Sequence, residues 1–463
     1  QPLSLHRSRN GTIFCGHVLM YDPYFDTTLC SNQPDIGSYW QAATPTSIDY
    51  PALKRDISCD TVIIGAGYTG LNCGYELAKV HQRDVVVLDA LQPGWGCSGR
   101  NGGFVLRGTG RLGLAQLASK FGLETARVFH REYGAAILRV NQLIERGNIA
   151  CQPQPGGYYK LTHKAGMAKS LAQQAAFLNQ HFDYPVQFLD KAQLRHQVVN
   201  HQQADAALYF PDCYGLNPLA LAHGYARMAT EAGASLYGQS PVISFKRLPA
   251  GFEVITRQAV ITARNLVLAT NAYTAKGLYP AINNSCLPVL SSVIVPEPLN
   301  ASQLQQLNWQ QNSIMMDTRM LKYYYRLLPD NRVLFGGRGA IKGKDAADPI
   351  YPRRLLAALK HCFAGLEHLT YQYQWSGWVG VSYDDLPRVV AAEPNLFYAA
   401  GYCGSGLSFS ALAGERLAQL VAGKTLPALP IYQSMLPGFP MSAWRRQGQQ
   451  MFYQWGRFKD HFL

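Results

Sequence analysis

Three glycines near the start of the chain have a spacing that suits the binding of a phosphate group. Gly65, Gly67 and Gly70 follow an apolar run at 61–64 and open a predicted helix at about 68–80. The first glycine permits a tight turn, the second lets the backbone approach a pyrophosphate, and the third lets helix and strand pack closely. The N–H groups at the start of the helix would then bind the phosphates.

An acidic residue stands where such a site needs one. Asp89 closes a second apolar run, at 85–88, and follows Gly70 by 19 residues. A carboxylate at this place accepts hydrogen bonds from the ribose hydroxyls of an adenosine. The order of strand, glycine turn, helix, strand and acid predicts a dinucleotide site. The alternative is a glycine-rich turn with a solvated Asp89.

Two more glycine-rich loops could hold the rest of the ligand. The loop at 94–103 contains five glycines together with Ser98, Arg100 and Asn101. It could complete a pyrophosphate cradle, and an NAD-only site does not require it. The loop at 399–408 leads into another predicted helix, whose positive end would face a flavin ring and stabilise its reduced form. A plain surface loop is the alternative for residues 94–103.

The elements that must position these loops are of two kinds. Residues 323–337 alternate like an antiparallel hairpin with its turn at 329–331. Buried parallel strands are instead predicted by short apolar runs at 61–64, 85–88, 263–270 and 396–400. Because these runs occur early, in the middle and late, we predict a nucleotide-binding domain that a second domain interrupts.

The predicted fold class is α/β. It combines a discontinuous Rossmann-type FAD-binding domain with a second, α+β substrate domain built on an antiparallel sheet. The patch at 38–41 should pack on the main body. The predicted boundaries are 1–58 for an irregular N-terminal arm, 59–155, 208–275 and 385–430 for the FAD-binding domain, 156–207 and 276–384 for the substrate domain, and 431–463 for a C-terminal tail.

Composition argues against several other classes of protein. The 463 residues carry a formal net charge of +13, but the basic residues form only pairs, so nucleic acid is not a predicted partner. Twelve histidines without metal-binding spacing predict no metal site. Ten scattered cysteines predict free thiols and a cytoplasmic location. The uncharged runs at 278–296 and 394–414 are interrupted by proline or glycine, and no membrane span is predicted.

Together, the three glycine-rich segments resemble the D-amino-acid oxidase/glycine oxidase superfamily of flavoproteins. Within it, the strings at 98–103, 215–220 and 323–337 are similar to the gamma-glutamylputrescine oxidase-like branch. The resemblance runs from about residue 38 to 423. It implies an FAD-dependent enzyme that oxidises a primary or secondary amine or an amino acid to an imine. Hydrolysis of the imine then gives an aldehyde or keto acid.

The resemblance also implies which residues contact the cofactor. Val242 is expected to reach the adenine through its backbone. The full set that the resemblance implies is Gly65, Gly67, Gly70, Asp89, Ser98, Arg100, Asn101, Gly102, Val242, Gly404, Ser405, Gly406, Leu407 and Ser408.

The chain departs from its relatives at several places. Cys97 stands where many carry alanine, and Ser405 where many carry histidine. The segment at 375–381 lacks the cysteine that binds flavin covalently in monomeric sarcosine oxidases, which implies non-covalent FAD. The lysine that activates oxygen in those enzymes has no identified counterpart. Oxygen and an electron-transfer acceptor therefore both remain open.

Aromatic residues are the candidates for the substrate side, because oxidation of a neutral amine needs a dry pocket. The candidate walls are Tyr323, Tyr324, Tyr325 and Trp378. Alternation places Tyr324 and Arg326 on one face of a strand and Tyr323 and Tyr325 on the other. An inward Arg326 could pair with a substrate carboxylate or phosphonate. The alternative is that the tyrosines only line a sheet and Arg326 is solvated.

Two other functions are compatible with a flavin site. One is a tRNA- or protein-modifying factor, for which the +13 charge would matter. The other is a flavin-binding module without turnover. A small-molecule amine or amino-acid substrate is the preferred prediction.

Overall fold

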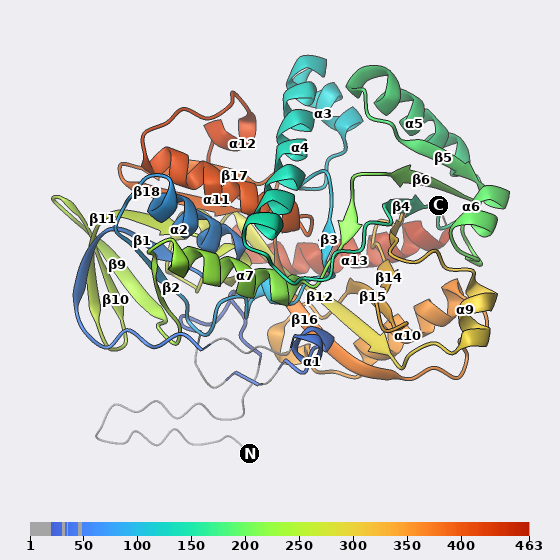
Figure 1. Cartoon of the computed structure of the whole chain (residues 1–463), viewed down its shortest axis with the longest axis horizontal. Coiled ribbons are helices and arrows are strands. Elements are labelled where there is room, and N and C mark those ends of the chain that lie inside the picture. Colours follow the sequence, from blue (N-terminus) through green and yellow to red (C-terminus); the bar gives the residue numbers. More distant parts are fainter. Residues whose placement is uncertain (1–19, 30–32, 35, 45–48, 463) are drawn as a thin grey trace.

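Two mixed sheets form the body of the protein, and several separate segments of the chain contribute strands to each of them (Figure 1). The computed structural model describes residues 20–29, 33–34, 36–44 and 49–462. The first sheet has the order β17-β18-β11-β1-β2-β8, with β9 and β10 joined to it through β11. Its strands are β1 (Ile57–Ile64), β2 (Val85–Leu88), β8 (Ser235–Tyr237), β9 (Val242–Leu248), β10 (Gly251–Thr256), β11 (Val260–Leu268), β17 (Arg388–Glu393) and β18 (Leu396–Ala400).

The core of this sheet is parallel, as the sequence predicts. β1 pairs in parallel with β2 and β11, and β11 in parallel with β18. Ile63 packs with the helices on one face, while Val62 and Ile64 pack with the β9–β10 hairpin on the other. Because both faces are covered, the strands are apolar along their whole buried length.

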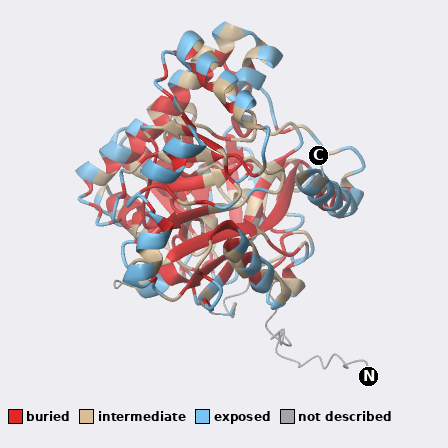
Figure 2. Ribbon diagram, turned by 90° about the vertical axis from the view of Figure 1, so that its right-hand side faces the viewer, coloured by how far each residue is buried: buried red, intermediate tan, exposed pale blue. Residues whose placement is uncertain are grey.

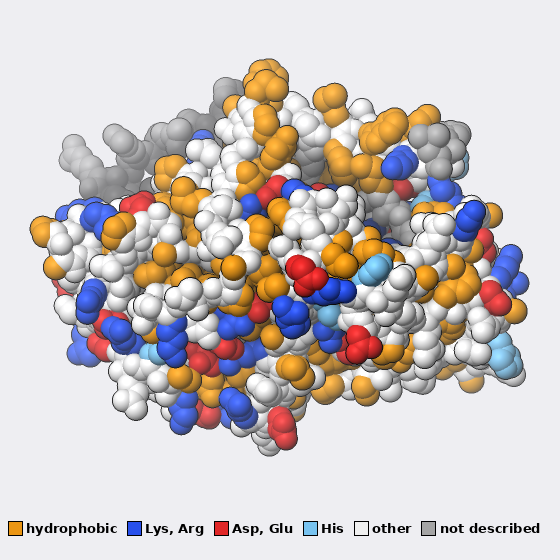
Figure 3. Space-filling view, turned by 90° about the horizontal axis from the view of Figure 1, so that it is seen from above, with side chains coloured by type: hydrophobic (Ala, Val, Ile, Leu, Met, Phe, Trp, Pro, Cys, Tyr) orange, Lys and Arg blue, Asp and Glu red, His pale blue; other side chains and the backbone are white. Residues whose placement is uncertain are grey.

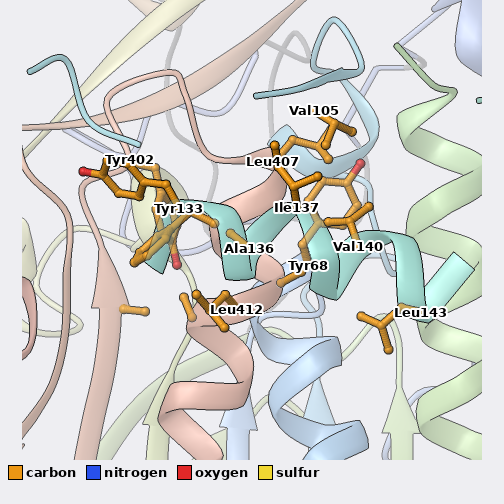
Figure 4. Packing of buried hydrophobic residues seen from close by; sticks show 14 of the residues in the cluster. Tyr68, Val105, Tyr133, Ala136, Ile137, Val140, Leu143, Tyr402, Leu407 and Leu412 are labelled. Atoms are coloured by element: carbon orange, nitrogen blue, oxygen red, sulfur yellow. The ribbon is translucent and has the colours of Figure 1, made fainter. Parts of the chain in front are cut away.

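Three helices lie on one face of the first sheet, and a fourth packs against two of them. The three are α2 (Tyr68–Lys79), α7 (Pro218–Glu231) and α11 (Leu407–Val421), and the fourth is α4 (Leu123–Arg146). Figure 4 shows the packing between them, where Tyr133, Ile137 and Val140 of α4 gather with Leu407 and Leu412 of α11. This contact fixes the first turn of α11 relative to the sheet, which matters for the site.

The second sheet has the order β16-β12-β15-β14-β13-β4-β6-β5. Among the described residues it is antiparallel except where β13 pairs with β4. The predicted hairpin is confirmed, because β14 and β15 pair in antiparallel register. The strands are β4 (Tyr158–Leu161), β5 (Gln187–Asp190), β6 (Ala206–Phe210), β12 (Cys286–Pro296), β13 (Ile314–Asp317), β14 (Tyr324–Leu327), β15 (Val333–Arg338) and β16 (Tyr371–Ser382).

The remaining elements surround this sheet or connect the two. A two-stranded pair joins β3 (Phe104–Val105) to β7 (Tyr214–Gly215). The predicted domain boundary at 208 falls inside β6, whose five residues all pair in the second sheet. The other helices are α1 (Tyr39–Ala43), α3 (Leu114–Phe121), α5 (Ala168–Phe182), α6 (Lys191–Gln197), α8 (Pro280–Asn283), α9 (Ala301–Leu307), α10 (Ile350–Cys362), α12 (Pro430–Gln433) and α13 (Arg445–Phe462).

The short helix α1 docks the N-terminal arm on the body, as predicted for the patch at 38–41. Ser38 caps α1 by accepting from the N–H of Gln41. Trp40 is 1% exposed and donates its indole N–H to the carbonyl of Asn101 at 2.9 Å. Other residues of the predicted arm, such as 1–19 and 45–48, lie outside the described residues.

Buried residues lie mainly inside the protein and charged residues on its surface. The buried residues concentrate on the strands, whereas the outer faces of the helices are exposed (Figure 2). On the face in Figure 3, Lys and Arg side chains are interspersed with Asp and Glu. Among the described residues, no helix combines the length and apolar character that crossing a membrane requires.

Candidate functional site

The glycine-rich loops and the second sheet enclose a cavity of about 1120 Å³. Small-molecule sites usually have about 300–1,000 Å³, so this one has room for a large cofactor and a substrate. Its wall includes the loops that precede α2 and α11 and the face of the second sheet that carries Tyr324. The site is therefore built where the two sheets meet.

The first glycine turn has the geometry that its spacing predicts. Gly65 has φ +104°, and a Cβ there would lie 2.9 Å from the carbonyl oxygen of Ala269. A Cβ on Gly70 would lie 1.9 Å from the carbonyl oxygen of Gly65, so Gly70 serves close packing and does not line the cavity. Gly67 lines the cavity and caps α2. The positive end of α2 thus faces the cavity.

Asp89 lies beside this turn, at the end of β2. Its carboxylate accepts from the N–H groups of Ala66 at 2.8 Å and Leu91 at 2.9 Å. Burial raises its pKa to about 6, although both backbone hydrogen bonds lower it. Val242, at the start of β9, lines the same part of the cavity. A carboxylate has lone pairs left after two such bonds and could accept further donors.

The loop at 94–103 forms the second wall. Ser98 accepts from the N–H of Tyr68, in the first turn of α2, at 3.0 Å. Arg100 is 6% exposed and donates to the carbonyl oxygens of Trp95 at 2.7 Å and Ser376 at 3.1 Å. Its Nη2 has no hydrogen-bond partner among the described residues. A buried donor of this kind favours a polar ligand in the cavity.

Asn101 and Gly102 shape the end of this loop. The Asn101 amide donates to the carbonyl oxygens of Cys97 and Ser98 and accepts from the N–H of Gly103, so its side chain holds the loop together. A Cβ on Gly102 would lie 3.1 Å from the ring of Tyr324. This loop therefore lies directly against the second sheet.

The loop before α11 forms the third wall. Gly404 has φ +90°, and Ser405, Gly406 and Leu407 follow it along the cavity. Helix α11 begins at Leu407 and directs a second positive helix end toward the site. Ser408 needs correction as a ligand contact: its hydroxyl donates to the carbonyl of Leu106 at 2.6 Å, and it does not line the cavity.

The face of the second sheet forms the floor of the cavity. Met316 pairs with Lys160 on one side and with Tyr324 on the other, and all three line the cavity. Paired residues point to the same face of a sheet. The Tyr324 hydroxyl hydrogen-bonds to that of Ser291 at 2.9 Å, and burial raises the pKa of Tyr324 to about 12. Tyr324 is therefore a neutral phenol at physiological pH.

The prediction for Arg326 needs correction. It shares a strand face with Tyr324, but it is 1% exposed and does not line the cavity. It donates to the carbonyl oxygens of Gly103 at 3.1 Å and Leu216 at 2.6 Å, and its guanidinium stacks on Trp40. The loop at 94–103 covers this end of the strand, so the position of Arg326 is that of an internal support.

The prediction for Trp378 as a cavity wall needs the same correction. Gly377 and Val379 line the cavity, and alternation along β16 turns Trp378 to the opposite face. Trp378 is fully buried and donates its indole N–H to the carbonyl of Tyr21 at 2.7 Å. Its role is to anchor the segment near Tyr21.

Sequence reasoning missed the charged residues of the floor. Lys160, Lys322 and Arg338 line the cavity, whereas Asp89 is the only acidic side chain in its described lining. Lys322 lies two residues before Tyr324, and Arg338 lies two residues after Gly336. Strand alternation could therefore have predicted that both side chains point to the same face of the sheet as Tyr324. Lys160 comes from β4, which is far from β14 in the chain, and nothing local indicates it.

The three loops fit a dinucleotide that carries a flavin. Two helix ends and the free Nη2 of Arg100 offer donors, while Gly67, which caps α2, borders the cavity without a side chain. The cavity thiols Cys97, Cys213 and Cys403 are kept protonated, because burial raises the pKa of Cys97 and of Cys403 to about 11 and that of Cys213 further. Among the described residues no cluster could hold a metal ion.

Comparison with known proteins agrees with this geometry. The family model described as FAD dependent oxidoreductase matches residues 60–420. Gamma-glutamylputrescine oxidoreductase of Escherichia coli (strain K12) is 30% identical over 389 residues, which cover 83% of this chain and 89% of the relative. A probable oxidoreductase OrdL of Haemophilus influenzae is 28% identical over 398 residues, covering 84% and 89% of the two chains.

Solved structures show the same fold. The crystal structure of glycine oxidase from Geobacillus kaustophilus matches with a TM-score of 0.66 and 22% identity, covering 83% of this chain and 100% of that chain. The family model and the first relative each span most of the chain. The chain therefore belongs to the DAO family of FAD dependent oxidoreductases.

Proposed function

We propose that this oxidoreductase converts the C–N bond of an amine or amino acid to a C=N bond. The carbon loses a hydride and the nitrogen a proton, and water then hydrolyses the imine to an aldehyde or keto acid and releases the nitrogen as ammonia or an amine. FAD bound in the cradle would supply the acceptor for the hydride. Relatives named for gamma-glutamylputrescine and glycine support an amine as the substrate.

The observation that carries this proposal is the contact between the cofactor loop and the floor of the cavity. Gly102 lies against Tyr324, and Gly404 to Leu407 border the same cavity. A small molecule that rests on Tyr324 would therefore lie next to the groups assigned to the flavin. Close placement of the reacting atoms accounts for a large part of the rate enhancement in such a step.

The residues of the floor favour the neutral form of an amine. Arg338 places positive charge in the cavity, and an ammonium ion beside it would lose its proton more readily. Tyr324 stays protonated because its pKa is about 12, so it orients the substrate and does not act as the base. The substrate would thus reach the reacting position as a free amine.

We also propose how the cofactor is held. Gly65, Gly67, Asp89 and Val242 would bind the adenosine part, while Ser98, Arg100, Asn101 and Gly102 would lie along the pyrophosphate and flavin. Residues 404–407 would contact the ring. The binding would be non-covalent, because thiols with a pKa of about 11 are poor nucleophiles at neutral pH.

Anaerobic reduction of the bound flavin tests the proposed activity. Substrate amines should bleach the absorbance of the FAD-loaded protein near 450 nm, and the imine product should appear as an aldehyde or keto acid in stoichiometric amount. Re-oxidation by oxygen or by an electron-transfer acceptor would then identify the second substrate. A flavin that no member of a broad panel of amines and amino acids reduces would contradict the proposal.

A further inference from the structure

A row of cationic side chains crosses the floor of the cavity. Arg338 ends β15, Lys322 lies just before β14, and Lys160 lies on β4. The sheet order β15-β14-β13-β4 puts three strand spacings between Arg338 and Lys160, or roughly 14 Å. The row therefore extends from the cofactor loops toward α5, beyond the reach of a very small substrate.

Among the described residues, no acid is hydrogen-bonded to or ion-paired with the cations of this row. The Lys322 ammonium and the Arg338 guanidinium make no hydrogen bond or ion pair with any other described residue. Lys160 donates to the neutral amide of Gln174 on α5 at 2.9 Å. Unpaired cations that share a cavity with a single acid, Asp89, favour an anionic ligand.

The acids closest to the row are already paired. Asp317 and Asp385 both act on the charge of Lys322, as do the cations Arg111 and Arg338. Asp317 forms an ion pair with Arg319, and Asp385 lies 3.8 Å from the guanidinium of Arg111. Each carboxylate is therefore shared with an arginine and only partly offsets the charge of Lys322.

The two lysines repel each other. Burial and the charge of Lys322 lower the pKa of Lys160 to about 8. Lys322 is exposed at the cavity surface, and desolvation by the surrounding protein, together with Arg111 and Arg338, lowers its pKa. An anion bound between the two lysines would relieve this repulsion and restore both pKa values.

We propose that Lys160 and Lys322 form a subsite for a carboxylate at the end of the substrate remote from the reacting amine. The proposal rests on amine oxidation as the function and narrows the substrate class. Tyr324 and Lys160 flank Met316 on either side, so they stand two strand spacings apart, roughly 10 Å. The substrate is thus an amine whose nitrogen and carboxylate are separated by a chain of several atoms.

Matched substrates test the subsite through turnover. An ω-amino acid of four to six carbons and its uncharged carboxamide are compared by anaerobic flavin reduction, together with a diamine of the same length. The wild-type protein should prefer the acid, and Lys322→Gln should reduce the acid-to-amide ratio of rate constants by roughly tenfold or more, as expected for loss of a charged contact. Lys322→Glu should shift the preference toward the diamine.

The control is Lys169→Gln, an exposed lysine on α5 that does not line the cavity. This variant should keep the wild-type ratio. An acid-to-amide ratio that stays unchanged in Lys322→Gln and in Lys160→Gln overturns the subsite. FAD content and thermal unfolding of each variant show whether it is folded.

A binding measurement separates the subsite from the proposed activity. Glutarate, a dicarboxylate without an amine, should bind the FAD-loaded protein in calorimetry, with affinity roughly tenfold weaker or worse in Lys160→Gln and Lys322→Gln. If no amine reduces the flavin but glutarate binding depends on the lysines, the activity fails and the subsite stands. If amines reduce the flavin but glutarate binds all variants equally, the subsite fails and the activity stands.

Discussion

At the scale of single residues, the environment decides what a side chain can do. Asp89 and Arg326 both came from patterns that suggest ligand contact, and the structure separates them. Asp89 lines the cavity with a carboxylate that still has accepting capacity. Arg326 instead donates to the backbone carbonyl oxygens of Gly103 and Leu216, beneath the loop at 94–103.

Asp89 should make FAD binding depend on pH. Burial raises its pKa in the cofactor-free protein to about 6, whereas hydrogen bonds from ribose hydroxyls would favour the ionised form. Binding would then release a proton, so the dissociation constant of FAD should rise as pH falls below about 6, by at most about tenfold per pH unit. Fluorescence titration of the cofactor-free protein with FAD measures this dependence.

The variant Asp89→Asn should weaken FAD binding by about 1–3 kcal/mol at pH 7 and remove most of this pH dependence. Asp84→Asn is the control, because Asp84 is exposed at the other end of the same strand region. If the dissociation constant of FAD depends on pH in the same way in Asp89→Asn, the titrating group is not Asp89.

Arg326→Met should act on the cofactor loop and not on substrate charge. The substitution leaves the carbonyl oxygens of Gly103 and Leu216 without their donors, and each lost hydrogen bond of this kind costs about 1–3 kcal/mol. FAD should therefore be retained less well after dilution, while the acid-to-amide ratio stays at the wild-type value. A selective loss of activity toward acidic amines would contradict this prediction and would indicate that Arg326 contacts the substrate.

At the scale of elements, local sequence patterns predicted the structure correctly, whereas contacts between distant segments could not be predicted from them. The glycine turn before α2 and the β14–β15 hairpin depend on neighbours within about 25 residues, and the structure confirms both. Alternation also predicted the shared face of Tyr324 and Arg326. The loop that covers Arg326 comes from residues more than 200 positions away, which alternation cannot indicate.

Pairing between distant segments also explains why the sequence did not predict Lys160 on the floor of the cavity. Lys160 enters the site because β4 pairs in parallel with β13, more than 150 residues later. The predicted domain boundary at 208 divides β6, which pairs with β4 and β5. Such pairings are set by tertiary packing, and a single sequence carries little signal for them.

The packing of α2 on β1 should tolerate one glycine substitution far better than another. A Cβ on Gly70 would lie 1.9 Å from a backbone oxygen, whereas a Cβ on Gly74 would lie 3.0 Å from a methyl group of Val87. Gly70→Ala must shift backbone, and we expect a loss of about 1–3 kcal/mol in the free energy of unfolding together with weaker FAD binding. Gly74→Ala should cost clearly less, as measured by urea unfolding. Equal losses would mean that α2 can move freely on the sheet.

At the scale of the whole molecule, the cavity unites segments that are far apart in the chain. Residues 65–67, 94–98, 100–102, 242 and 404–407 all border it, together with the floor from the second sheet. Arg100 is one of these residues, and no described residue accepts a hydrogen bond from its buried Nη2. A ligand that satisfies such groups links both sheets through one set of contacts.

FAD should therefore stabilise both sheets together. A ligand that binds only the folded state adds about 2.7 kcal/mol at a concentration 100 times its dissociation constant. Thermal unfolding of the FAD-loaded protein should move to higher temperature as free FAD increases, and signals from both sheets should shift together. Acid precipitation should release the flavin into the supernatant, as expected for non-covalent binding. Flavin that stays with the precipitate would point to Cys97, Cys213 or Cys403, the described thiols that line the cavity, and would contradict the non-covalent assignment.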